Sequence, residues 1–104
     1  MKTHVWVAPP KGYGTPIDRR PLPVDERLGI LRRLGRRDGW RCHWCGRGFR
    51  RTPARRCTID HLVPVSVGGS WALSNLVLAC RACNETRGDM PVDAWRSLIE
   101  SRIQ

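Results

Sequence analysis

The sequence has no long run of hydrophobic residues. None of its apolar stretches approaches the roughly 20 residues that a membrane-spanning helix needs. The first residues, Met1 to Trp6, lead into Pro9 and Pro10 without the apolar segment of a secretory signal peptide. We therefore expect a cytoplasmic protein with no membrane partner.

Acidic residues are also scarce. The 104 residues include 9 acids against 19 basic residues, which gives a formal net charge of +10. Nearly all of the basic residues are arginines, and the stretch from Arg32 to Arg56 contains a single acid, Asp38. Such an excess attracts polyanions, so it favours nucleic acid as the partner. A solvated face that is basic only for solubility is the alternative.

The five cysteines cannot all pair in disulfides, because their number is odd. Four of them form two Cys-x-x-Cys pairs, Cys42 with Cys45 and Cys80 with Cys83. In a small cytosolic chain this pattern favours a structural zinc site, in which four thiolates leave no position open for a substrate. A redox motif or ordinary packing cysteines are the alternatives, and Cys57 is expected to be a buried apolar side chain.

Sequence periodicity predicts an extended arm and three helices. Residues 1–24 hold five of the eight prolines and favour an extended arm. A helix is expected from about 25 to 38, a short one from 80 to 88 and a last one from 93 to 102. In the first helix, the leucines that recur at three-residue spacing should face inward: Leu28, Leu31 and Leu34. Four arginines of the same helix should face outward: Arg32, Arg33, Arg36 and Arg37.

The middle of the chain favours less regular structure. Residues 57–65 predict a short β segment, which is broken by Pro64 and followed by a turn at Gly68 and Gly69. Residues 73–79 are largely apolar, and we interpret them as a loop that returns the chain to the core.

Four polar residues in this region could carry chemistry: Asp60, His61, Asn75 and Asn84. A histidine can act as a base near neutral pH, and carboxylate and amide oxygens suit a hard cation such as Mg²⁺. Adjacent strand residues face opposite sides, so Asp60 and His61 reach one site only if the strand ends or twists there. Each residue also has an ordinary structural interpretation, as a capping acid, a half-buried histidine or a turn asparagine.

The spacing of these residues resembles that of HNH endonucleases. Asp60-His61 is followed after 13 residues by Asn75 and after 8 more by Asn84, with the second cysteine pair directly before Asn84. This is similar to the zinc-containing branch of the family in which the last histidine is an asparagine, a branch with many small phage-encoded members. The resemblance covers about residues 28–95. It implies an α+β, ββα-metal (His-Me finger) fold with a four-cysteine zinc site and flanking helices, over a nuclease domain at 25–104.

The resemblance also implies a role for each residue. His61 would be the general base that activates water. Asp60 and Asn84 would hold a catalytic divalent cation, Mg²⁺ or another such as Mn²⁺ or Ni²⁺. Asn75 would hold the loop that orients His61, and Arg87 would contact phosphate.

The expected activity is cation-dependent hydrolysis of double-stranded DNA with low sequence specificity, by nicking or by cutting both strands. Family context adds phage packaging proteins as partners and the host-cell cytoplasm as the location. A non-catalytic, zinc-containing nucleic-acid-binding module is the alternative, and the oligomeric state stays open. Further contacts with the DNA backbone are expected from loop arginines: Arg50, Arg51, Arg55 and Arg56.

Overall fold

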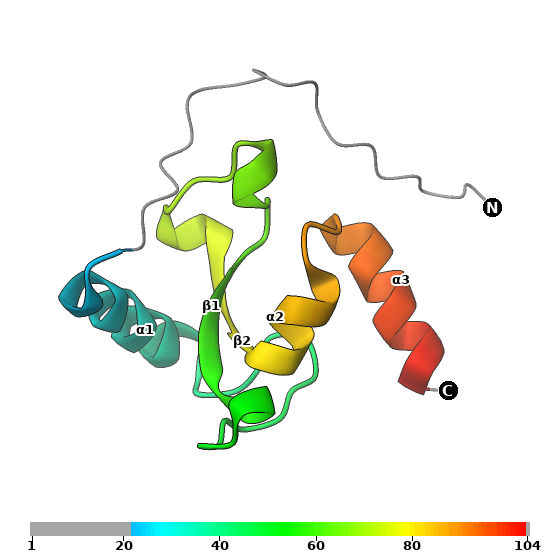
Figure 1. The fold of residues 1–104 in the computed structure, drawn as a ribbon, viewed down its shortest axis with the longest axis horizontal. Coiled ribbons are helices and arrows are strands. Elements are labelled where there is room, and N and C mark those ends of the chain that lie inside the picture. Colours follow the sequence, from blue (N-terminus) through cyan, green and yellow to red (C-terminus); the bar gives the residue numbers. More distant parts are fainter. Residues whose placement is uncertain (1–21, 104) are drawn as a thin grey trace.

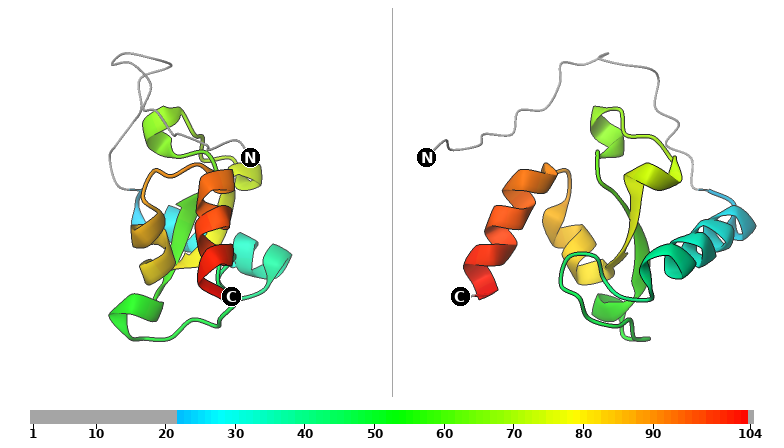
Figure 2. Two further views of the ribbon diagram at one scale, coloured as in Figure 1. Left: turned by 90° about the vertical axis from the view of Figure 1, so that its right-hand side faces the viewer. Right: turned by 180° about the vertical axis from the view of Figure 1, so that it is seen from behind.

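The computed structural model describes residues 22–103, which form three helices around a two-stranded sheet. In Figure 1 the sheet lies in the middle, α1 lies on one side of it, α2 lies on the other, and α3 lies beyond α2. The view from behind in Figure 2 shows the same order. This arrangement confirms the predicted α+β class. The elements are α1 (Val24–Asp38), β1 (Cys57–His61), β2 (Leu76–Cys80), α2 (Arg81–Arg87) and α3 (Val92–Ile103).

The two strands pair antiparallel along their full length, with Cys57 opposite Cys80 and His61 opposite Leu76. β1 ends at His61, earlier than the expected end at residue 65. The expected arm at 1–24 lies almost entirely outside the described residues. None of the described helices is long and apolar enough to cross a membrane.

Strand β2 corrects the prediction of a loop over residues 73–79. All five of its residues are buried, so the sequence shows none of the apolar–polar alternation of a half-exposed strand. Leu76 and Leu78 pack with Leu34 of α1 on one face. Val77 and Ala79 join a second cluster on the other face. Burial on both faces therefore hid this strand from pattern reasoning.

Helix α1 covers one face of the sheet through only part of its leucine stripe. Leu34 is fully buried, whereas Leu28 remains 42% exposed. At the end of the helix, Arg37 donates hydrogen bonds of 2.7 Å to the carbonyl oxygens of Leu73 and Leu76. This arginine, expected to face outward with the others, therefore ties α1 to the start of β2.

Helix α3 closes the second cluster. Trp95 is 2% exposed and meets Trp44 edge to face, with ring centroids 6.3 Å apart. Leu98 and Ile99 pack against the same cluster. Trp95, Leu98 and Ile99 therefore form the inward face of this helix.

The loop between the strands turns at Gly68 and Gly69, as predicted. Gly68 has φ +92°, in the left-handed region that favours glycine. Gly69 lies so close to the preceding chain that a Cβ there would overlap the carbonyl oxygen of Val63. The loop can therefore close in this way only with glycine at residue 69.

Replacing Gly69 by alanine should destabilise the protein by about 2–3 kcal/mol, because the backbone at Val63 must shift to make room. Urea denaturation of the zinc-loaded protein measures this loss. Gly29→Ala is the matched control, since a Cβ there meets nothing within 4 Å in a helix interior. It should leave stability unchanged or raise it by up to about 1 kcal/mol. Equal midpoints for the two variants would contradict the predicted crowding.

Candidate active site and metal centre

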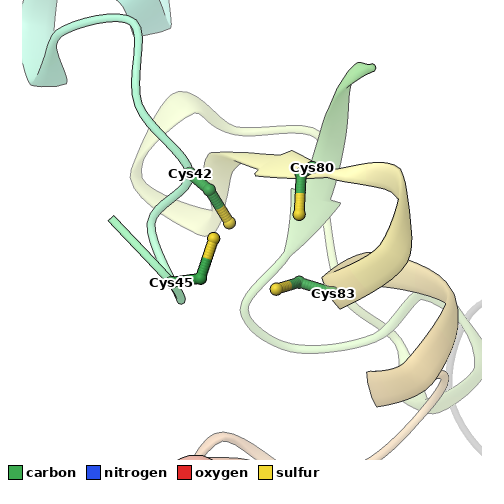
Figure 3. Close-up of side chains that lie close together, drawn as sticks. All are labelled: Cys42, Cys45, Cys80 and Cys83. Atoms are coloured by element: carbon green, nitrogen blue, oxygen red, sulfur yellow. The ribbon is translucent and has the colours of Figure 1, made fainter. Parts of the chain in front are cut away.

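Four cysteines converge on one point beside the sheet. Cys42 and Cys45 come from the loop after α1, Cys80 ends β2 and Cys83 lies in the first turn of α2. Their sulfur atoms all lie within 4.8 Å of one another, and Figure 3 shows them pointing toward a common centre. Tetrahedral zinc with Zn–S bonds of about 2.3 Å places its sulfurs about 3.8 Å apart, so the four thiolates fit this ion. The predicted grouping is confirmed, and it forms a zinc-type site.

The backbone holds the first cysteine pair against β2. The N–H of Cys42 donates to the carbonyl of Arg47 at 2.8 Å, which closes the tight turn around the pair. The N–H of His43 donates to the carbonyl of Leu78 at 2.8 Å. The loop is therefore fixed on the sheet at the point where β2 delivers Cys80.

Cys57 takes no part in this cluster. It is half-buried at the start of β1 and packs with the apolar residues under α1. Burial raises the pKa of its thiol to about 11, so the side chain is a neutral thiol near pH 7. This placement agrees with the apolar role expected from the sequence.

Asp60 is buried and already bonded within the protein. Its Oδ2 accepts hydrogen bonds from Nε1 of Trp44 at 2.8 Å and from Nη1 of Arg87 at 3.0 Å. The guanidinium of Arg87 also lies over the Trp44 ring, 5.1 Å from the centroid. Among the described residues, no hydrogen bond reaches Oδ1. One carboxylate oxygen therefore serves the fold and the other is left for a further ligand.

Arg87 is the residue that departs furthest from its expected place. It is 2% exposed, and all three guanidinium nitrogens are used inside the protein. Nε donates to the carbonyl of Met90, Nη1 to Asp60 and the carbonyl of His61, and Nη2 to the carbonyl of Leu62. The short helix α2 lies against the end of β1, so a residue three after Asn84 points at the carbonyls where the chain leaves the strand. In this arrangement no nitrogen of Arg87 is left for a phosphate.

His61 has surroundings separate from those of Asp60. Its ring meets Trp71 edge to face, with centroids 4.3 Å apart. Nε2 is buried and has no hydrogen-bond partner in the described part of the chain. Burial lowers the pKa of His61, and the nearby Arg87 lowers it further, against an opposite effect of Asp60. The imidazole is therefore neutral near pH 7.

Asn84 is held by strand β1. Its Nδ2 donates to Oγ1 of Thr58 at 3.0 Å and to the carbonyl of Ile59 at 3.2 Å. Thr58 in turn donates to the carbonyl of Ala79 on β2 at 2.7 Å. Because both bonds are made by the amide nitrogen, the amide orientation is fixed, and Oδ1 forms no hydrogen bond with residues 22–103 and can accept another ligand.

Asn75 holds the loop that follows His61. Its side chain forms a pair of hydrogen bonds with the backbone of Val63, at 2.9 and 3.2 Å, and a third with the carbonyl of Ser70 at 2.9 Å. The N–H of Leu62 donates to its backbone carbonyl at 2.8 Å. These contacts are of the kind that the sequence interpretation assigned to this asparagine.

The loop arginines divide into two kinds. Arg55 is half-buried and donates from Nη2 to the carbonyl of Gly48 at 2.6 Å, which closes its own loop. The other three are exposed: Arg50, Arg51 and Arg56.

Sequence reasoning missed two tryptophans at the site, Trp44 and Trp71. A tryptophan between two metal-binding cysteines is a signal for Trp44, because a buried indole N–H needs an acceptor and Asp60 supplies it. Trp71 carries no such signal. Its contact with His61 depends on how the glycine turn folds back over the strand.

An antiparallel pair of strands followed by a short helix, with a four-cysteine cluster at their junction, has the arrangement of a ββα-metal fold. Residues 42–90 match the family model described as HNH endonuclease. A search of the curated proteins found no match.

Cys80→Ser should abolish stoichiometric zinc binding and lower stability by several kcal/mol, because binding of a structural zinc contributes directly to folding. Zinc content measured by mass spectrometry, together with thermal unfolding, tests this. Cys57→Ser is the control, and it should keep one zinc per chain. A folded, zinc-free Cys80→Ser protein would argue against a structural metal.

Arg87→Met should cost about 3–5 kcal/mol, because it leaves the carboxylate of Asp60 buried without its partner. Arg81→Met removes the other ion pair of the same helix, with Glu85, whose side chains are 47% and 64% exposed. That pair should be worth about 0.5 kcal/mol or less. Denaturant midpoints of both variants provide the comparison. A similar loss of stability in both would contradict the larger contribution predicted for the buried pair.

Proposed function

We propose that this protein is a metal-dependent endonuclease that hydrolyses phosphodiester bonds in DNA. The observation that carries the proposal is a groove that Asn84 lines and that His61 borders through Trp71. Asn84 and Trp71 both line a groove of about 520 Å³, and Trp71 contacts His61. A candidate cation ligand and a candidate base therefore lie beside one surface that can receive a phosphate.

His61 is the general base in this proposal. A neutral imidazole accepts a proton from the attacking water as the water oxygen bonds to phosphorus. Nε2 is buried, so Nδ1 would take the proton. The bond from phosphorus to the 3′ oxygen then breaks, and the departing oxygen takes a proton from solvent water, which leaves a 5′-phosphate and a 3′-hydroxyl. Trp71 and the loop held by Asn75 would keep the imidazole in place.

Asp60 and Asn84 would hold the divalent cation, through Oδ1 of the carboxylate and Oδ1 of the amide. One carboxylate and one amide oxygen leave most coordination positions to water and phosphate, as Mg²⁺ prefers, and Mn²⁺ or Ni²⁺ can use the same donors. A bound cation would neutralise the charge that builds on the phosphate and the departing oxygen. Arg87 already balances part of the charge of Asp60, so the protein alone should bind the cation weakly.

The zinc would act only on structure, because four thiolates close its coordination shell. Cys83 directly precedes Asn84, so the zinc would fix the part of α2 that presents the amide. Exposed arginines such as Arg50, Arg51 and Arg56 would contact the phosphate backbone without reading bases, which implies low sequence specificity and strong salt dependence. Phage DNA packaging in a host cytoplasm is the setting we infer.

One observation favours a different function. The buried ion pair gives Asp60 a structural role that needs no catalysis. A zinc-containing module that binds nucleic acid without cutting it is therefore the second candidate, and a cleavage assay separates the two.

His61→Ala should lower the rate of plasmid nicking by about 100-fold or more, because it removes the base. Conversion of supercoiled to open-circular DNA is measured with Mg²⁺, Mn²⁺ or Ni²⁺ in turn. DNA binding and zinc content should stay at the level of the unmodified protein.

His43→Ala is the matched control, since His43 is exposed in the cysteine loop. It should nick at the normal rate. Full activity of His61→Ala would remove His61 as the base. Binding without nicking by the unmodified protein, with every cation, would favour the non-catalytic module.

A further inference from the structure

The groove beside the candidate site follows the edge of β1 that has no strand partner among the described residues. Residues of α1 line one side of it, residues of α2 the other, and the loop before β2 contributes Trp71. Figure 1 shows α1 and α2 on opposite sides of β1, as this position requires.

Three arginines from separate segments surround the groove: Arg27 of α1, Arg56 just before β1 and Arg81 of α2. All three are exposed. Arg81 pairs with Glu85 at 2.6 Å, whereas Arg27 and Arg56 form no ion pair with any described residue. The walls of the groove are therefore positively charged at separated points, which suits successive phosphates of one strand.

The same groove presents apolar surface. Trp71 is 41% exposed and Leu28 is 42% exposed, although both are large hydrophobic residues. Leu28 is the part of the predicted leucine stripe that does not pack inward. An indole and an aliphatic side chain between cationic groups suit the face of a nucleobase. The bases of an intact duplex are stacked inside it and cannot offer that face.

We propose that this groove binds an unstacked nucleotide of a DNA strand, with its base on Trp71 and its neighbouring phosphates on Arg27, Arg56 and Arg81. The substrate class is then DNA that is single-stranded or locally unpaired at the point of cleavage. This inference rests on the proposed endonuclease function and narrows its substrate. The contact of Trp71 with His61 places the bound nucleotide beside the candidate base.

Fluorescence anisotropy with labelled oligonucleotides tests the proposal in buffer without added Mg²⁺, Mn²⁺ or Ni²⁺, on zinc-loaded protein. The probes are a single DNA strand, the same sequence as a blunt duplex, and the same sequence as RNA. The single DNA strand should bind most tightly. Trp71→Ala should weaken its binding about tenfold and leave duplex binding nearly unchanged, and Trp71→Phe should restore most of the loss.

Two arginines of α1 form a matched pair of charge variants. Arg27→Ala should reduce the preference for the single strand over the duplex. Arg36→Ala removes an exposed charge from the same helix outside the groove, so it should leave that preference unchanged. Circular dichroism and zinc content confirm that each variant is folded.

Equal single-strand affinity of Trp71→Ala and the unmodified protein would overturn the proposal, and so would tighter binding of the duplex. Tighter binding of RNA would overturn DNA as the occupant. Because these measurements involve no cleavage, they fail or succeed separately from the nicking assay. A protein that nicks plasmid but shows no single-strand preference refutes only this inference.

Discussion

The structure depends on one buried ion pair, between Asp60 of β1 and Arg87 of α2. Trp44 donates to the same carboxylate oxygen and lies under the guanidinium, so the cysteine loop joins the pair. The remaining donors of Arg87 bind three backbone carbonyls where the chain leaves β1 and approaches α3. Desolvation offsets much of the attraction in such a pair, so its main effect is to permit a single arrangement of these segments.

Helix α2 is restrained at both of its ends. It has seven residues, which is too short for a helix to be stable without tertiary contacts. Zinc bound by Cys80 and Cys83 would hold its beginning, and Arg87 holds its end. Asn84 lies between these restraints and is bonded to β1 through its amide nitrogen. The amide oxygen is thus oriented by contacts on every side, as precise positioning of a ligand group requires.

The sequence was most informative where local chemistry sets the structure. The cysteine pairs, the glycine turn and helices with a clear apolar stripe were predicted correctly, because each depends on neighbours a few residues away. β2 was missed because burial on both faces removes its periodicity. The interior place of Arg87 was missed for a related reason. Three of its four acceptors lie 25 to 27 residues earlier, and only the packing of α2 against β1 brings them within reach.

The arginines of this chain have two physical roles: some donate to backbone carbonyls inside the protein, and others give its surface a positive charge. Arg37 and Arg87 donate to backbone carbonyls near the ends of strands, Arg55 donates to a carbonyl of its own loop, and Arg87 alone serves four acceptors. A lysine has a single nitrogen and cannot span such a set. Of the described arginines, the exposed ones without such bonds are the ones available to a polyanion, so the net charge overstates the basic surface that a nucleic acid could contact. Around the groove this free charge lies next to exposed apolar side chains, and that combination favours a strand whose bases are unstacked over a closed duplex.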